Sequence, residues 1–493
     1  MNQLARKTVN GAAINISVTV TKIVLQFVVV IPILARVLPP SDFGLVAMAM
    51  AFVTLFTMFN DLGISAALVR ADKPSTAFWS SAFWTNLFIG SLLTLVSYFA
   101  APYIAAFFEE PGVEPLMRAL SWVLLMHCIF LVPMAWLQRN YRFSTIAIID
   151  LSAVILSAIV AIATALNGFG VWALIWQQIT MYSTKMLGGL LSHRAPLRFV
   201  YKAEEIIRVL PFSMGLTGTA LVSFVNRNTD RILIGKFMGT DALGYYGRAY
   251  QIMLMPVQSL ALGASFALYP AMSEIKHDQT QLGRVFLKAL SILSALIFPM
   301  MTGMAIVAVP FVALMFGPKW DAVAPVLRLL AFVGIIQATI ATSNVVWKAV
   351  GRSDVLLHWS LIRMVAFVGA FIIGINLGTL EALAGAYLAA NAALFLPFQL
   401  GALKQLGLGL KDFWQALAPQ ILSTLIMSLV LISLQILVPN LATWASYSQL
   451  ALLVPAGIIA YGLSMLIFFR PFVTGLISEA RTLFLKRPKA PAG

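Results

Sequence analysis

The chain alternates between long runs of apolar residues and short polar connections along its whole length. We count fourteen apolar runs, each long enough to cross about 30 Å of hydrocarbon as a helix. The ten-residue alternation that is typical of an outer-membrane barrel does not occur. The pattern predicts an all-α integral membrane protein with spans at 10–37, 42–69, 76–101, 116–137, 143–166, 170–191, 206–236, 241–270, 282–310, 321–348, 353–376, 381–405, 413–438 and 447–470.

Composition strengthens this prediction and narrows the function. Hydrophobic residues make up 60% of the chain, charged residues only 10%, and the mean hydropathy is +0.91, so a water-soluble core could not bury the apolar surface. The net charge of +15 is spread over separate polar connections. Nucleic-acid binding would need it gathered on one face, and we therefore expect no nucleic-acid partner. Cys128 is the single cysteine, so no intrachain disulfide can form.

The distribution of lysine and arginine predicts the orientation. With both termini placed in the cytoplasm, 22 of the 33 basic residues fall on the inner side and five on the outer side. Such an excess in short cytoplasmic connections is the usual signal of topology, and it requires an even number of spans. We therefore expect a multi-pass membrane protein with both termini in the cytoplasm, and we attribute most of the basic charge to topology.

The chain also contains an internal repeat. "ILARVLPPSDFG" at 33–44 is matched by "ILIGKFMGTDALG" at 232–244, and Gly44 maps onto Gly244 at an offset of 200. The same register aligns "DLGISAALVR" with "ALGASFALYP". The first two spans are thus repeated as the seventh and eighth.

The repeat predicts two lobes of six helices. Because an even number of spans separates the copies, both cross the membrane in the same direction, and parallel repeats of this kind surround a central substrate site in transporters. We predict an N-terminal lobe at 1–200, a C-terminal lobe at 201–410, two additional transmembrane helices at 411–470 and a basic cytoplasmic tail at 471–493.

Six of the 33 basic residues are left after the inner and outer ones are counted, and they lie away from the polar connections: Lys22, Lys185, Arg227, Arg248, Arg328 and Arg363. A charge at the centre of a span costs about 2.5–3.5 kcal/mol on insertion scales, so each must reach an interface, pair with a counter-ion or face water. Lys185 and Arg328 lie near span ends, and we expect their long side chains to reach the headgroups. Lys22 and Arg363 lie near mid-membrane, and we expect them to face protein or a water-filled cavity.

Arg227 and Arg248 lie in one layer of neighbouring spans. In the repeat Arg248 corresponds to Met48, so the scaffold repeats but the charge does not. This asymmetry favours a ligand-binding role for the two arginines. The alternative is an internal salt bridge with Asp230 or Asp61.

Three acidic residues lie deep in the predicted spans, Asp61, Asp150 and Asp230. Each is a candidate ion-coupling site or a counter-ion for a buried cation.

A cationic cavity suits an anionic ligand, and guanidinium groups match phosphate oxygens in bidentate fashion. The ligand is therefore expected to be phosphorylated. The sequence has no G-x-x-x-x-G-K-[ST] loop for ATP, and its four histidines lack metal-ligand spacing. We expect no cofactor, no metal and no enzymatic reaction.

At this point a family resemblance becomes visible. "ILARVLPPSDFGLVAMAMAF" followed by "DLGISAALVR" resembles the start of polysaccharide-transport proteins, the Wzx-like branch of the multidrug/oligosaccharidyl-lipid/polysaccharide flippase superfamily. "YYGRAYQIMLMP" is similar to a helix of the related lipid II flippase, which has an arginine at the place of Arg248.

The resemblance implies a function. It implies two six-helix lobes around a cationic cavity, which move undecaprenyl-diphosphate-linked oligosaccharide from the inner to the outer leaflet for exopolysaccharide, capsule or lipopolysaccharide export. It also implies two C-terminal helices associated with the lipid tail. A polysaccharide polymerase and a chain-length regulator are the partners it suggests.

Two other classes stay open. A membrane-embedded polysaccharide polymerase or ligase would need a sizeable outer loop, whereas the longest predicted here has about fifteen residues. A drug or cation antiporter of the same fold would place acidic residues in its cavity, whereas basic residues predominate here.

Overall fold

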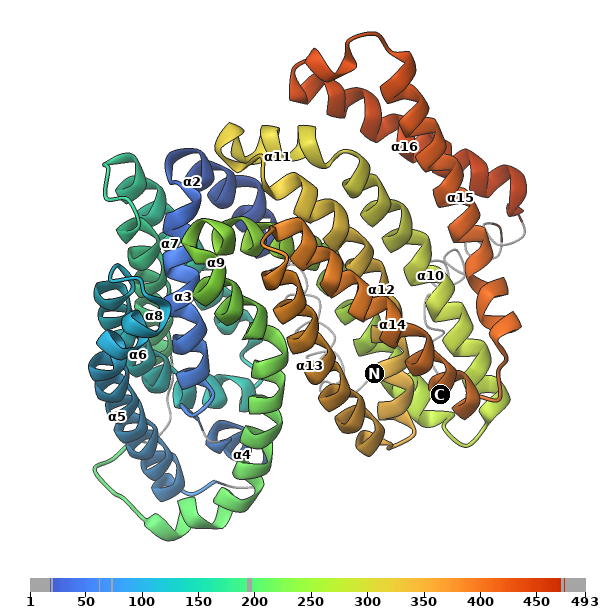
Figure 1. Cartoon of the computed structure of the whole chain (residues 1–493). Helices are drawn as coiled ribbons and strands as arrows, with labels where there is room; N and C mark the ends of the chain where they lie inside the picture. The colour runs from blue at the N-terminus through green and yellow to red at the C-terminus, as the bar shows by residue number, and fades with distance from the viewer. Residues whose placement is uncertain are drawn as a thin grey trace. The chain divides into compact units, whose positions relative to one another are not determined.

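The structure is a computed structural model that describes residues 18, 21–61, 63–71, 74–192, 197–470 and 474, without the side chains at 28, 209–223, 226, 227, 261, 262, 264, 266 and 267. In this described part every element is helical, which confirms the all-α prediction (Figure 1). Helices are expected because a chain in lipid must satisfy its backbone hydrogen bonds internally. The elements are the π-helix η1 Leu25–Val30, α2 Ile31–Val37, α3 Pro40–Thr57, α4 Ile64–Arg70, α5 Thr76–Phe108, α6 Val113–Arg139, α7 Phe143–Leu166, α8 Trp172–Ser192, α9 Ala203–Glu274, α10 Gln279–Ile306, α11 Ala308–Phe316, the 3-10 turn η2 Pro318–Trp320, α12 Val323–Ala349, α13 Ser353–Asn376, α14 Leu380–Gln405, α15 Leu410–Leu437, the 3-10 turn η3 Leu441–Thr443 and α16 Ser446–Phe468.

Ten of the described helices are long and apolar enough to cross a membrane, namely α3, α5, α6, α7, α10, α12, α13, α14, α15 and α16. The other four predicted spans fall on η1 with α2, on α8 and on the two parts of α9. The protein is thus a multi-pass membrane protein, while the count of fourteen spans stays a prediction.

Two helices are interrupted where the backbone adopts a positive φ. The predicted span at 42–69 breaks between α3 and α4, where Gly63 has φ 76°. The 72-residue helix α9 contains a break at Gly239, with φ 84° and ψ −175°, between the spans predicted at 206–236 and 241–270. Glycine adopts this left-handed region without the strain that a side chain would introduce.

The chain forms two compact units, described here one at a time. Unit 1 comprises the described residues up to Gly247 together with Phe316–Lys319, and unit 2 comprises the rest from Arg248. The start of α9 and its segment up to Gly247 therefore belong with the N-terminal helices, although the repeat predicts a division near residue 200. The division at residue 200 stays a prediction of the sequence repeat.

The helices of each unit pack in the same order. In unit 1, α5 packs on α6, α6 on α8, and α7 on α8. In unit 2, α10 packs on α12, α12 on α14, and α13 on α14, as Figure 1 shows. The lengths agree as well, since α6 and α12 each have 27 residues and α7 and α13 each have 24. The internal repeat thus extends over more helices than the sequence match covers.

Side-chain caps begin the corresponding helices α5 and α10. Ser75 accepts a hydrogen bond from Phe78 N at 2.9 Å, and Asp278 accepts one from Gln281 N at 2.9 Å. A cap of this kind contributes about 0.5–2 kcal/mol. The two C-terminal helices belong to unit 2, where α15 packs between α10 and α16.

Within unit 1 the two copies of the repeat meet at two glycines. A side chain at Gly44 would overlap the backbone carbonyl of Thr240, and a side chain at Gly244 would overlap the backbone carbonyl of Pro40. Gly44 and Gly244 correspond at the offset of 200, and each packs against the residue four positions before the other glycine. The contact is therefore reciprocal, as in a two-fold interface where residue i meets j and j meets i. We call these four residues the glycine seal.

Candidate functional site

Two lysines share one carboxylate inside unit 1. Lys22 Nζ lies 2.8 Å from Asp150 Oδ2, and Lys185 Nζ lies 3.2 Å from Asp150 Oδ1. The three side chains are 28%, 26% and 21% exposed for Lys22, Lys185 and Asp150. We call this group the lysine cluster. With two cations and one anion it has a net positive charge in a membrane-spanning region.

Three elements build the cluster. Asp150 lies on α7 and Lys185 on α8, which pack against each other, while Lys22 precedes η1, which contacts α7. A carboxylate inside an apolar helix such as α7 is expensive unless it is paired. The residues from Leu25 to Val30 form a π-helix, a rare element that is frequent at functional sites and that changes the register of the side chains before it.

The expected role of Lys185 was wrong. We expected this side chain to reach the headgroups, but its ammonium group lies on Asp150 instead. A signal for this pairing was present in the sequence. Asp150 and Lys185 lie about 10 Å and about 9 Å from the inner ends of neighbouring predicted spans, at 1.5 Å per residue, and therefore at one depth.

The cluster can bind an anion. An ammonium group has three donors and no acceptor, and each lysine uses one donor on Asp150. The carboxylate keeps the two lysines together and offsets part of their desolvation cost, which leaves donors available for phosphate oxygens.

Polar side chains that the sequence analysis did not single out continue this region of unit 1. The amide of Asn60 lies 3.1 Å from His127 Nδ1, and the ring of His127 meets that of Tyr182 edge to face at 5.7 Å. Tyr182 lies one helical turn before Lys185 on α8. These residues occur singly in apolar helices, so no local motif identifies them.

In unit 2 the predicted site residues are Arg248 and Arg363, and both are half-buried. The guanidinium group of Arg248 donates to Gln251 Oε1, one turn further along α9. Arg363 Nε donates to the backbone carbonyl of Trp359 at 3.2 Å, and its Cζ lies 5.2 Å from the centre of the Phe398 ring. Cation–π contacts of this kind hold a guanidinium in place without neutralising it.

The remaining candidates have separate surroundings. The side chain of Arg227 lies outside the described residues. Asp61 Oδ1 accepts hydrogen bonds from Ser65, and buried Asp230 accepts one from the backbone N–H of Arg231 at 2.8 Å. Among the described residues, neither aspartate forms a salt bridge with an arginine or lysine side chain.

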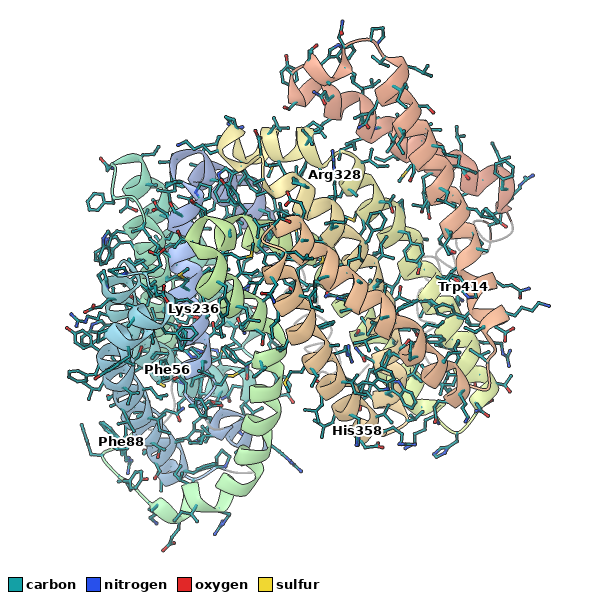
Figure 2. All side chains as sticks on the ribbon, viewed as in Figure 1. Phe56, Phe88, Lys236, Arg328, His358 and Trp414 are labelled. Carbon is teal, nitrogen blue, oxygen red and sulfur yellow. The ribbon has the colours of Figure 1, made fainter. Side chains whose placement is uncertain are left out.

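A second charged contact lies beside the glycine seal. Lys236 on α9, labelled in Figure 2, lies 2.6 Å from Glu109 Oε1 and 5.6 Å from the centre of the Phe107 ring. The hydrogen bond from Lys236 and its charge lower the pKa of Glu109. Because the glutamate side chain is 79% exposed, solvent screens the pair and its contribution to stability is small.

Unit 2 also contains an apolar cavity of about 300 Å³ between α10, α12, α14 and α15. Its wall includes Phe298, Phe332, Phe395 and Trp414, the last labelled in Figure 2. Such a cavity suits hydrocarbon rather than a charged group. In the described part of the chain, no three His, Cys, Asp or Glu side chains are grouped to hold a metal ion.

Comparison with known proteins agrees with the fold and with the family resemblance. The family model described as "Polysaccharide biosynthesis protein" matches residues 33–325. The succinoglycan biosynthesis transport protein ExoT of Rhizobium meliloti (strain 1021) is 30% identical over 356 residues, which cover 72% of each chain. The teichuronic acid biosynthesis protein TuaB of Bacillus subtilis (strain 168) is 26% identical over 404 residues, 81% of this chain and 83% of TuaB.

A solved structure shares the fold. The lipid II flippase MurJ in an inward closed conformation superposes with a TM-score of 0.76 at 17% identity, over 92% of this chain and 98% of MurJ. The predicted resemblance is confirmed by the family match and by the relatives. Since the family model covers more than half of the chain, the chain belongs to the polysaccharide biosynthesis protein family.

Proposed function

We propose that the protein is a flippase that moves undecaprenyl-diphosphate-linked oligosaccharide from the inner to the outer leaflet of the bacterial inner membrane by alternating access. The product would serve exopolysaccharide, capsule or lipopolysaccharide export, and both termini would lie in the cytoplasm. The names of ExoT and MurJ support this class, since one is a transport protein of polysaccharide biosynthesis and the other a lipid flippase. We propose no enzymatic step.

The lysine cluster carries the proposal. A diphosphate loses its hydration when it leaves water, and it needs charged donors in return. Lys22 and Lys185 supply ammonium groups that Asp150 already holds together. In the proposed mechanism both lysines keep contact with the carboxylate while their free donors bind the diphosphate. Arg227, Arg248 and Arg363 stay further candidate phosphate ligands, as the sequence predicts.

The prenyl chain would stay with apolar surroundings. The 300 Å³ cavity supports a role in holding the prenyl chain, because its wall is almost entirely apolar. Part of that wall belongs to α15, one of the two additional C-terminal helices. Hydrocarbon contributes about 0.8 kcal/mol per buried methylene group. Flipping would therefore require transfer of the charged head alone across the apolar layer.

The glycine seal provides a place where the pathway opens and closes. The seal lies at helix ends that the predicted topology places on the outer side of the membrane. Release of the substrate to the outer leaflet would therefore require the two backbone segments of the seal to separate. The contact is made by backbone atoms packed against glycine. Its neighbour, the exposed pair Glu109–Lys236, is also weak. In the proposed mechanism the seal opens and closes as the protein alternates between its two states.

The test replaces Lys22 and Lys185 by alanine, singly and together, in a strain that lacks the native gene. Polymer export and lipid-linked glycan on the cytoplasmic side are measured at matched protein levels. Arg328→Ala is the matched control, because Arg328 is a basic residue inside a predicted span that is exposed on α12. We expect reduced export and inner-leaflet accumulation for the lysine variants only.

Two outcomes would contradict the proposal. Unimpaired export in the double variant would remove the lysine cluster from the mechanism. Accumulation of lipid-linked glycan on the outer side of the deletion strain would instead indicate a polymerase.

A further inference from the structure

The segment directly before α9 is held on the first turns of α5 by two serine side chains. Ser80 Oγ accepts a hydrogen bond from Arg198 N at 2.9 Å, and Ser81 Oγ accepts one from Lys202 N at 2.7 Å. Both serines are 0% exposed. Neighbouring Cα atoms are about 3.8 Å apart, so the two anchors lie close together and the three residues between them must bulge away from α5. We call the segment from Arg198 to Lys202 the aromatic bulge.

The tip of the aromatic bulge exposes large rings. Phe199 is 94% exposed and Tyr201 is 58% exposed. Trp84 on α5 donates from Nε1 to the backbone carbonyl of Arg198 at 3.0 Å, and its ring centre lies 5.0 Å from that of Phe199. The tip is therefore fixed to α5 by a hydrogen bond and by a ring contact. Tryptophan and tyrosine concentrate where the hydrocarbon of a membrane meets the headgroups.

The length of α5 places the bulge at that boundary. The helix has 33 residues and is about 50 Å long, about 20 Å longer than the hydrocarbon core of a bilayer. When α5 is centred in the core, about 10 Å of it projects at each end. Ser80 and Trp84 lie about 6 Å and about 12 Å from the start of the helix at Thr76, on either side of the boundary. The predicted topology places this end of α5 on the inner side.

The aromatic bulge carries hydrogen-bond donors that the protein does not use. In the described part of the chain, the backbone N–H groups of Phe199, Val200 and Tyr201 form no hydrogen bond. The side chains of Arg198 and Lys202 are exposed, and neither forms an ion pair with a described residue. Unpaired backbone groups are not tolerated in hydrocarbon, so these N–H groups must face a polar layer.

The two glutamates that follow the bulge have other roles. Glu204 and Glu205 lie in the first turn of α9, where carboxylates interact favourably with the helix dipole. Glu205 Oε1 also accepts a hydrogen bond from Ser75 Oγ at 3.1 Å. Within the bulge itself both charged residues are basic.

An anionic phospholipid matches all of these features. Its phosphate accepts from guanidinium, ammonium and backbone donors, while its glycerol and upper acyl carbons cover the exposed rings. A soluble anion would leave the rings uncovered, and a zwitterionic lipid brings its own cation beside the phosphate. We propose that the aromatic bulge, together with Trp84, is a binding site for the headgroup of an anionic phospholipid of the surrounding bilayer, separate from the lysine cluster.

The experiment uses the purified full-length protein in detergent, so it does not depend on the transported substrate. A bimane fluorophore is attached to Val200→Cys in a Cys128→Ala background; because contact with tryptophan quenches bimane, its emission reports on the approach of the tip to Trp84. Phosphatidylglycerol or phosphatidylcholine is then titrated into the detergent. We expect a saturable change in emission with phosphatidylglycerol and none with phosphatidylcholine.

Joint replacement of Arg198 and Lys202 by glutamine should weaken the apparent affinity for phosphatidylglycerol about tenfold, because basic residues near a membrane surface attract anionic lipid. Both side chains are exposed, so the fold should persist, which the melting temperature checks. Arg352→Gln is the matched control. Arg352 is exposed in another connection that the predicted topology places on the inner side, but its guanidinium already pairs with Asp354 at 2.9 Å. This variant should keep the affinity of the unsubstituted labelled protein.

Three results would overturn the site. Equal changes in emission with both lipids would show that the bulge does not recognise the charge of the headgroup. An unchanged affinity after both glutamine substitutions would remove the basic side chains from the site. A response to phosphatidylglycerol that disappears in Lys22→Ala would place the lipid at the lysine cluster instead.

Discussion

Substitution of the seal glycines gives a prediction whose size follows from the structure. In Gly44→Ala the added methyl group would overlap the carbonyl oxygen, carbonyl carbon and Cα of Thr240, and in Gly244→Ala it would overlap the carbonyl oxygen and carbon of Pro40. These are backbone atoms, which cannot rotate away as a flexible side chain would. The closed contact must therefore widen in either variant.

The free-energy change caused by replacing a seal glycine with alanine has two contributions of opposite sign. Alanine is favoured over glycine inside a helix by about 1 kcal/mol, which stabilises the variant. Overpacking of a tight contact costs about 1–3 kcal/mol, which opposes closure of the seal. Gly247→Ala separates the two, because Gly247 lies three residues after Gly244 on α9 and a methyl group there would meet nothing within 4 Å. The difference between Gly244→Ala and Gly247→Ala isolates the overlap.

Access to the seal can be measured with a cysteine reporter. Leu243→Cys, in a Cys128→Ala background, places a thiol at a buried position of α9 inside unit 1. A shift of 1–3 kcal/mol changes a two-state population about 5- to 150-fold. The rate of labelling by a membrane-impermeant maleimide should rise by that factor in Gly44→Ala and in Gly244→Ala. The two sites are neighbours, so their combined effect should be smaller than the product.

The reasoning is refuted if both seal variants label at the rate of Gly247→Ala and melt at its temperature. In that case the close approach of the two backbones would carry no energetic consequence. Faster labelling in all three variants would instead indicate a general loosening of α9.

Three further predictions concern the charged groups. Asp150→Asn leaves two ammonium groups without their shared counter-ion and should lower stability by about 1–3 kcal/mol, less than for a fully buried pair, as measured by thermal unfolding in detergent. Glu109→Gln should lower the melting temperature slightly at neutral pH, because the folded protein lowers the pKa of Glu109. This difference in melting temperature from the native protein should shrink as the pH falls below about 4.3, the pKa of an unfolded glutamate, and vanish below the folded pKa. Arg363→Lys keeps the charge but loses the planar contact with Phe398, which should cost about 0.5–1 kcal/mol and reduce polymer export; export equal to that of the native protein would show that the contact is dispensable.

The helical spans and their orientation could be predicted from the sequence, because hydropathy and charge bias are averaged over many residues. Hydropathy over about twenty residues identifies a span whatever its neighbours are, and the charge bias of the connections is counted in the same way. The repeat was visible through Gly44 and Gly244 because a backbone contact that admits no side chain restricts the residue at both positions. The family resemblance rested on the same segments.

Pairings between side chains were decided only by the tertiary structure. The sequence placed Lys22, Lys185 and Asp150 at their depths, but which of them meet depends on the rotation of each helix about its own axis. The π-helix after Lys22 changes that rotation, and hydropathy does not record it. The same holds for Asn60 and Asn86, whose unpartnered oxygens can be recognised only once their surroundings are known. The sequence by itself determined that this chain is a helical membrane protein with an internal repeat, because membrane spans are set by composition. Tertiary packing decided which polar atoms face one another, because contacts depend on the rotation of each helix about its axis.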